Sequence, residues 1–278
     1  MATQLNISAR SVQRILQNEL KLKPLKFQKA HDLTPQQKKV RLVRARELLR
    51  RAESGELPNL VFSDEAPFTI EQVVNKQNDR VYLPKRTYEN LHLRTVTRTQ
   101  KPSMVMIWAA ITADGRSPLV FVDRGVKINA PIYRRKVLNA VLKPWANKHF
   151  GRRPWTFQQD SAPGHKADIT QEWLKINVPH FISRSEWLAN SPDANPLDYS
   201  IWGILKEKVG TKRYTSIDHV KRALRQEWAK IPQSHLRAAC DGFWAVSRPL
   251  FAPKEAISKI TNIFLNLMYF RTFFALPQ

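Results

Sequence analysis

The sequence predicts a mixed α/β domain that follows a short basic helical arm. Three features predict this class: strand-like apolar segments come first in the body of the chain, helical periodicity alternates with them later, and positive charge gathers near the N-terminus. The chain has 278 residues, of which 42% are hydrophobic. That content is enough to bury a core, and it excludes a disordered basic tail standing alone.

The charge of the chain predicts a polyanionic partner. Lys and Arg number 46 against 23 Asp and Glu, so the formal net charge is +23. Residues 1–51 carry 13 of the basic residues and only three acidic ones. Nucleic acid is the leading candidate, although charge alone does not separate a nuclease from a repressor or a ribosomal protein. The single cysteine, Cys240, excludes an intrachain disulfide and a cysteine-rich zinc module.

The basic arm, residues 1–52, is expected to hold two helices. Ser8 is suited to cap the first, whose apolar residues recur at helical spacing over 12–20 until Pro24 breaks the pattern. Thr34–Pro35 fits the cap and the first position of the second helix. DNA contact is expected for both helices, and a solvated basic face is the alternative for the second. The residues expected to make these contacts are Arg10, Arg14, Lys38, Lys39, Arg41 and Arg44.

The body of the chain, residues 53–245, alternates strand and helix signals after a turn-like linker at 54–58. Apolar runs bounded by turn residues predict strands at 60–62, 73–74, 81–83, 104–111, 119–122 and 155–157. Helical periodicity predicts helices at 132–150, 166–176, 196–209 and 216–229. Residues 246–278 form a divergent tail, whose apolar run at 260–276 is too short and too interrupted to span a membrane.

Three aspartates are candidates for a common acidic site. Asp64 and Asp160 each end a predicted strand, and ligands bind at the carboxyl ends of strands in open α/β sheets. Asp198 lies near the start of a predicted helix, on the same face as Trp202. Clustered carboxylates repel one another and raise each other's pKa, so divalent cations would be needed to hold them together. Oxygen ligands with little histidine favour two Mg²⁺ or Mn²⁺ ions over zinc.

Neighbouring residues offer other interpretations. Asp193 is a rival third ligand, although a role in a turn or cap is the preferred one. Glu65 would point to the opposite side of its strand from Asp64, which favours a supporting role. His165 is expected to cap or hydrogen-bond rather than to catalyse, and Asn195 to support the turn before the third aspartate.

Three segments resemble the catalytic blocks of mariner-type transposases: FSDEAPF, QQDSAPGHKA and SPDANPLDYSIW. The similarity extends from about residue 7 to about residue 243. It implies a ribonuclease-H-like catalytic domain behind helix-turn-helix modules. It also places Asp64 on the central first strand, Asp160 at the end of the fourth strand and Asp198 on a later helix. The 38 positions between the last two aspartates resemble a subgroup with a longer Asp-Asp-Asp spacing.

The resemblance also implies an activity. A transposase of this family cuts DNA at the element ends with two bound Mg²⁺ or Mn²⁺ ions, and the freed 3′-hydroxyl then attacks target DNA. The implied partners are double-stranded DNA and a second copy of the chain in a homodimer, with no membrane, and the implied location is the nucleus. A catalytically silent DNA-binding remnant and a ribonuclease-H-type nuclease without strand transfer remain the alternatives.

Two segments of this chain affect which of the family's DNA contacts we expect it to make. At residues 80–101 the family places an extended loop that reaches a partner subunit and DNA, although a plain solvent-exposed hairpin would also fit. The basic residues of this segment expected to contact DNA are Lys85, Arg86, Arg94 and Arg98. Only seven residues precede the helix at 8–20, which resembles the second recognition helix of the family. We therefore expect a truncated N-terminus and weakened sequence-specific binding.

Overall fold

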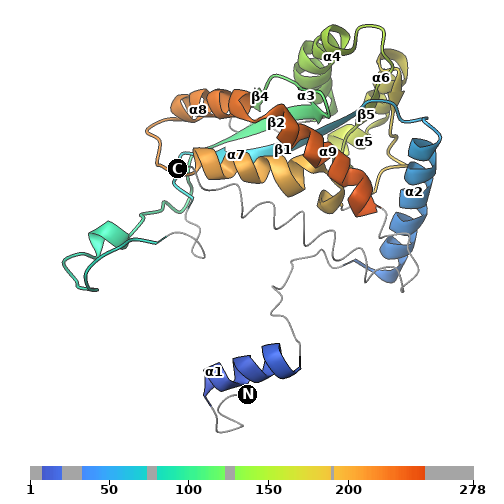
Figure 1. Cartoon of the computed structure of the whole chain (residues 1–278). Coiled ribbons are helices and arrows are strands. Elements are labelled where there is room, and N and C mark those ends of the chain that lie inside the picture. Colours follow the sequence, from blue (N-terminus) through green and yellow to red (C-terminus); the bar gives the residue numbers. More distant parts are fainter. Residues whose placement is uncertain (1–7, 21–32, 74–79, 123–128, 189–190, 248–278) are drawn as a thin grey trace. The chain divides into compact units, whose positions relative to one another are not determined.

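The computed structural model describes residues 8–20, 33–73, 80–122, 129–188 and 191–247 (Figure 1). The chain divides into two compact units between Thr34 and Pro35. Pro24 and the apolar run at 260–276 lie outside the described residues.

The first unit contains a short helix, α1 (Ala9–Arg14), which continues as a π-helical turn, η1 (Ile15–Glu19). The expected N-cap is confirmed, because Ser8 Oγ accepts a hydrogen bond from the backbone N–H of Ser11 at 3.0 Å. The two arginines of α1 are exposed. The exposed arginines therefore place positive charge on the solvent-facing surface of α1, and Ser8 caps the N-terminus of this helix.

The described part of the second unit is organised around a six-stranded mixed sheet in the order β3-β2-β1-β5-β6, with β4 paired to β2. The strands are β1 (Leu60–Thr69), β2 (Met104–Thr112), β3 (Gly115–Arg116), β4 (Val120–Val122), β5 (Thr156–Gln158) and β6 (His180–Phe181). β1 is central, antiparallel to β2 over 62–69 and parallel to β5 over 60–62. The strands expected at 104–111, 119–122 and 155–157 are confirmed.

The central strand β1 is longer than the sequence predicts. The sequence pattern ends it at the acidic residues Asp64 and Glu65, but the strand passes through them to Thr69. The predicted end was wrong because β2 offers backbone partners along this whole stretch, and that pairing outweighs the polar side chains. Asp64 consequently lies within a strand, not in a loop that follows one.

Other differences from the predicted elements are local. The described residues of the strands expected at 73–74 and 81–83 are irregular, whereas the two-residue strand β6 was not expected. Valine and tyrosine favour a strand only where a neighbouring strand accepts their backbone groups, so the prediction at 81–83 was wrong, while residue 74 lies outside the described residues.

Helices cover both faces of the sheet (Figure 1). They are α3 (Ala130–Tyr133), η3 (Arg134–Leu142), α4 (Lys143–Phe150), α6 (Asp168–Asn177), α7 (Trp202–Val209), α8 (Ile217–Lys230) and α9 (Gln233–Ser247). The first four enclose a core cluster with Trp108 and Phe157, and the last three enclose a second cluster with Phe62 and Ile111. All four expected helices are confirmed, and α9 is additional. None of the helices in the described ranges combines the length and apolar character that a membrane span requires.

The basic helix α2 (Pro35–Glu53) belongs to the second unit. It begins at the expected proline, and Ala45 and Leu48 are buried in the same core cluster as Phe243 of α9. The compact units therefore do not coincide with the boundary that the sequence suggests after residue 52. The reason is that apolar residues at helical spacing give this highly charged helix one face that packs on the domain.

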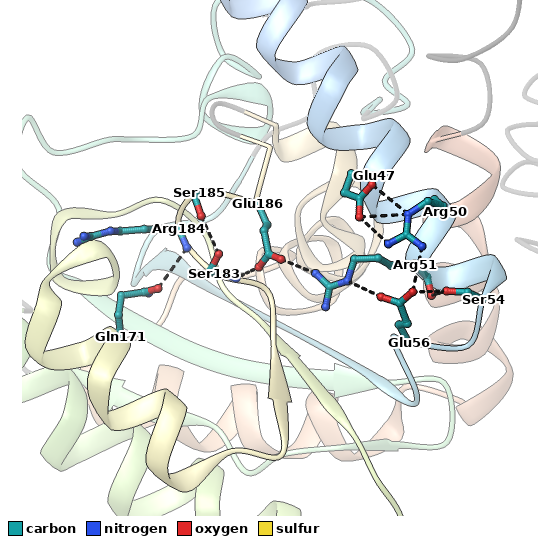
Figure 2. A network of polar contacts seen from close by, with 10 residues as sticks. All are labelled: Glu47, Arg50, Arg51, Ser54, Glu56, Gln171, Ser183, Arg184, Ser185 and Glu186. Atoms are coloured by element: carbon teal, nitrogen blue, oxygen red, sulfur yellow. Dashed lines mark hydrogen bonds and ion pairs between the residues drawn. The ribbon is translucent and has the colours of Figure 1, made fainter.

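The last turn of α2 makes several ion pairs, and a tight turn of the chain follows it (Figure 2). Gly55 adopts a left-handed φ of 77°, and Ser54, Gly55 and Glu56 are exposed, whereas Leu57 is buried. Arg51 Nη1 lies 2.6 Å from Glu186 Oε1, which fastens the helix to the loop before the third acidic block.

Candidate active site

Asp64 lies where the central strand loses one of its neighbours. β5 pairs with β1 only over Leu60–Phe62, so Asp64 is two residues beyond the parallel pairing. Its side chain is buried, and the indole Nε1 of Trp202 donates a hydrogen bond to Asp64 Oδ2 at 2.7 Å. Asp64 therefore faces α7, the helix that carries this tryptophan.

Asp198 reaches the same place from the π-helical turn η5 (Leu197–Ile201), which leads into α7. Asn195 fixes the start of this turn, because its Oδ1 accepts the first N–H of η5 and its Nδ2 donates to the carbonyl of Ser63, both at 3.1 Å. The sequence-based role of Asn195 as a support for this turn agrees with these contacts. The charge of Asp198 consequently acts on the Asp64 carboxyl and helps to raise its pKa.

Asp160 completes the group from the loop after β5. Its Oδ1 accepts hydrogen bonds from the N–H of Ala162 at 2.9 Å and from His165 Nδ1 at 2.5 Å. Its side chain is 45% exposed, and its negative charge acts on the Asp198 carboxyl. Charge effects thus connect Asp160 to Asp198 and Asp198 to Asp64.

The three carboxyl groups differ in their electrostatics. Burial, together with the charges of Asp198 and Glu65, raises the pKa of Asp64 to about 8. Burial and the charge of Asp160 also raise the pKa of Asp198. Burial acts against ionisation of Asp160 as well, but the hydrogen bond from His165 outweighs it and the pKa of Asp160 is lowered. Two of the three groups therefore resist ionisation until a positive charge approaches them.

Glu65 belongs to a further group of ligand-type side chains, which also includes Asp160. Glu65 points away from Asp64, as strand alternation requires, and its Oε1 lies 3.4 Å from His165 Nε2. One ligand atom each of Glu65, Asp160 and His165 lies within 4.8 Å of the others. The predicted hydrogen-bonding role of His165 agrees with this geometry. The short helix α5 (Pro163–Lys166) turns the chain back so that the histidine reaches the aspartate five residues earlier.

Two arginines expected to contact DNA instead fasten α2 to the domain. Arg41 forms an ion pair with Asp193, and only 12% of its side chain is exposed. Arg44 Nη1 donates to the carbonyl of Trp187 at 2.9 Å. The ion pair also places Asp193, the rival third ligand, against α2. Position along a basic helix did not reveal these roles, because the inward face is set by the apolar residues between the arginines.

Residues 80–101 expose both charge and apolar surface. Tyr82 and Tyr88 are 94% and 88% exposed. Arg94 is half-buried and donates to a backbone carbonyl of the same segment at 3.1 Å, so it stabilises the local fold. The predicted DNA-contact residues that are exposed are Arg10, Arg14, Lys38, Lys39, Lys85, Arg86 and Arg98.

The fold and the acidic group define a class of protein. A central strand, the loop after its parallel neighbour and a later helix each carry one of the three aspartates on a mixed sheet covered by helices. This fold is ribonuclease-H-like.

Sequence comparison finds a transposase. No family model matches the chain. The chain is 32% identical over 136 residues to the Tc3 transposable-element transposase of Caenorhabditis elegans. The aligned part is 48% of this chain and 39% of that protein, so the chain spans well under two thirds of this relative.

Solved structures of the Mos1 transposase have the same fold. The Mos1 paired-end complex with the left transposon end matches with a TM-score of 0.71 at 20% identity, over 90% of this chain and 71% of that one. The catalytic domain of the Mos1 mariner transposase matches with a TM-score of 0.61 at 19% identity, over 80% of this chain and 96% of that one. Other matching Mos1 structures are a strand-transfer complex and paired-end complexes with Mn or Mg. The chain is therefore similar in sequence to the Tc3 transposase over 136 residues and shares the fold of the Mos1 catalytic domain.

Proposed function

We propose that the protein is a transposase, which cuts DNA strands and joins the freed 3′ ends to target DNA. The observation that supports this proposal is the mutual electrostatic effect of Asp64, Asp160 and Asp198, which come from three separate elements. The sequence relationship to the Tc3 transposase and the fold of the Mos1 strand-transfer complex support the same reaction class. An intact acidic centre disfavours the alternative of a catalytically silent DNA-binding remnant.

The residues present fit divalent cations. Carboxylates are hard oxygen ligands, and the raised pKa of Asp64 and Asp198 marks negative charge that a cation would stabilise. Asp64, Asp160 and Asp198 would hold two Mg²⁺ or Mn²⁺ ions. Ions bound in this way lower the pKa of an attacking water and stabilise the leaving oxygen of a phosphodiester.

The chain's own residues orient these ligands before DNA binds. Trp202 fixes Asp64 through Oδ2, and Asn195 ties the start of η5 to β1 beside Asp64. The hydrogen bonds to Asp160 hold the third carboxylate on its loop. Because the supporting groups are mostly buried, the carboxylates need little rearrangement when substrate arrives, which is the preorganisation that catalysis by charge requires.

Double-stranded DNA is the proposed substrate, and the exposed basic residues would contact its phosphates. Two copies of the chain would act together through residues 80–101, where Tyr82 and Tyr88 offer apolar surface next to Lys85 and Arg86. Replacing residues 84–98 by a short Gly-Ser turn tests this role, and unchanged dimerisation and DNA binding would contradict it. A nuclear location follows from a chromosomal substrate, and imaging of a fluorescent fusion tests it.

The decisive experiment compares Asp160→Asn with a matched control, Asp193→Asn. Both variants remove one carboxylate, but the charge of Asp160 acts on Asp198, whereas Asp193 forms an ion pair with Arg41 of α2. With Mg²⁺ and plasmid DNA, we expect wild type and Asp193→Asn to cleave and Asp160→Asn to be inactive. Equal cleavage by all three would reject the acidic centre. Joining of a pre-cleaved duplex to plasmid separates a transposase from a nuclease without strand transfer.

A further inference from the structure

We propose that His165 is a positioning residue that holds the Asp160 carboxylate in one orientation for cation binding, with Glu65 as its second anchor. This role rests on the proposed function, because Asp160 is a ligand of the proposed cation site. The observation behind it is a chain of contacts from Glu65 through His165 to Asp160.

One ring nitrogen of His165 fixes one oxygen of Asp160. Nδ1 lies 2.5 Å from Asp160 Oδ1, and the N–H of Ala162 donates to the same oxygen at 2.9 Å. The carboxylate cannot rotate about its Cβ–Cγ bond without breaking both contacts. Since both engage Oδ1, the other oxygen, Oδ2, is left for a cation.

The other ring nitrogen anchors the histidine to the central strand. Nε2 lies 3.4 Å from Glu65 Oε1, and this oxygen is buried and makes no hydrogen bond within the described residues. The ion pair with His165 therefore compensates its burial. Glu65 directly follows Asp64 on β1, so His165 links the loop that carries Asp160 to the strand that carries the first aspartate.

His165 is itself held in place. Its side chain is 4% exposed, and its ring packs against Tyr133 with a centroid separation of 4.1 Å. Its carbonyl accepts hydrogen bonds from Gln159 Nε2 at 3.2 Å and from Gln171 Nε2 at 2.9 Å. A ring confined in this way cannot turn away from Asp160, and outer-shell groups act on metal sites by such confinement of a ligand.

The same geometry argues against His165 as a direct ligand. A nitrogen that binds a metal must present its lone pair to the ion, whereas Nδ1 is already at hydrogen-bond distance from Asp160 and Nε2 faces Glu65. The histidine therefore acts through Asp160.

Two substitutions separate the two contacts. In His165→Asn the amide nitrogen can replace Nδ1, so the contact to Asp160 is kept and the one to Glu65 is lost. In His165→Gln the longer amide can reach Glu65 but does not replace the contact to Asp160. His149→Gln is the matched control, because His149 Nε2 lies 2.9 Å from Asp114 in a His–Asp pair outside the acidic centre.

The experiment measures Mn²⁺ binding to the full chain by isothermal titration calorimetry, with circular dichroism as the test of folding. We expect wild type and His149→Gln to bind equally and His165→Gln to bind about 10–100-fold more weakly; His165→Asn, which keeps the contact to Asp160 but loses the anchor to Glu65, should lie between them. A folded His165→Gln with wild-type affinity would overturn the proposal, and so would His165→Asn as weak as His165→Gln.

Pulsed electron paramagnetic resonance of Mn²⁺ in the wild-type chain gives a second readout, which does not depend on the folding of any variant. We expect no directly coordinated nitrogen, and a strong nitrogen coupling would show that His165 is a ligand and overturn the positioning role. If the wild-type chain binds no Mn²⁺, the proposed cation site itself fails. That result is distinct from equal binding by wild type and His165→Gln, which refutes only the role of His165.

Discussion

Trp202 donates a hydrogen bond from its indole Nε1 to Oδ2 of Asp64 at 2.7 Å, joining α7 to the central strand across 138 positions of sequence. The ring is buried and packs edge-on against Phe68. A donor aimed at a carboxylate favours its charged form, so this contact partly opposes the burial that raises the pKa of Asp64. Trp202 is thus a core residue that also tunes the acidic centre.

Trp202→Phe should weaken both the fold and cation binding. Phenylalanine keeps most of the ring packing but removes the donor, so a buried carboxylate oxygen loses its partner at a cost of about 1–3 kcal/mol in the free energy of unfolding. Loss of the donor also raises the pKa of Asp64 further, and Mn²⁺ affinity at neutral pH should fall. Urea denaturation and calorimetric titration measure the two effects.

Trp228→Phe is the control for this substitution. The indole Nε1 of Trp228 donates to the carbonyl of Ser117 at 2.9 Å, and its ring stacks on Trp202. Its replacement removes a comparable buried hydrogen bond that does not reach the aspartates, so stability should fall and Mn²⁺ affinity should not. Equal loss of affinity in both variants would mean that core packing, and not the donor, sets the affinity.

Cation affinity should rise with pH and level off above about pH 8. The pKa of Asp64 is raised to about 8, so below that pH a proton occupies the carboxyl and must leave when a cation binds. Each unit of pH below this value should lower the apparent Mn²⁺ affinity by up to about tenfold. Calorimetry from pH 6 to 9 in buffers of different ionisation enthalpy measures both the affinity and the released proton. A flat profile would contradict the raised pKa.

The same shift affects the stability of the metal-free protein. A carboxyl whose pKa is higher in the folded state than in the unfolded chain stabilises the fold at low pH and loses that contribution as pH rises toward 8. Asp64→Asn is neutral at every pH, so it should gain stability relative to wild type between pH 5 and pH 9. Thermal unfolding of the two proteins side by side reports this difference.

Asn195→Ala should damage both the start of η5 and the acidic centre. The variant loses the bond to the first N–H of η5 and the bond to the carbonyl of Ser63. Loss of a cap costs about 0.5–2 kcal/mol, and without the tie to β1 the Asp198 carboxyl is free to move from Asp64. Ser216→Ala removes the N-cap of α8, whose Oγ accepts from His219. It should match the loss of stability while leaving DNA cleavage intact; cleavage that survives in both would refute the role of Asn195.

The sequence pattern was sufficient to predict elements whose structure depends on residues that are close together in the chain. The continuous apolar run at 104–112 formed a strand, and Ser8 and Ser216 capped helices whose periodicity begins just after them. It failed for the length of β1, because the continuation of that strand past Asp64 depends on partners in β2 about 45 residues away in sequence. Local polarity carries no information about such a partner.

The acidic centre shows the same difference between features that local sequence predicts and features that depend on distant residues. The motifs identified Asp64, Asp160 and Asp198, since each lies next to a strand or helix signal. The residues that orient them were recognised only in part: the sequence places Trp202 on the same helix face as Asp198, but nothing in that spacing indicates a donor to Asp64. Likewise Arg44 shares its charge and helix with the exposed Lys38, and only the packed face of α2 distinguishes the two.

Leu48→Ala should destabilise the whole second unit, because α2 is part of its core. Leu48 is 3% exposed and lies in the same cluster as Phe243, so its truncation should cost about 2–5 kcal/mol in the free energy of unfolding. Val43 of the same helix is 59% exposed, and Val43→Ala should change stability by less than about 0.5 kcal/mol. Urea denaturation compares the two, and an equal, small effect would mean that α2 is a separate arm.

The two kinds of basic residue should differ in their effect on the salt dependence of DNA binding. Arg86 is exposed, and each phosphate that such a side chain neutralises contributes about −0.9 to the slope of log affinity against log salt concentration. Arg86→Ala should therefore reduce that slope by about one contact without changing stability. Arg44→Ala should do the opposite, because its guanidinium is engaged by the Trp187 carbonyl within the domain. Fluorescence anisotropy with a labelled duplex at several salt concentrations measures the slope. If Arg44→Ala reduced the slope without lowering stability, the result would show that Arg44 contacts DNA.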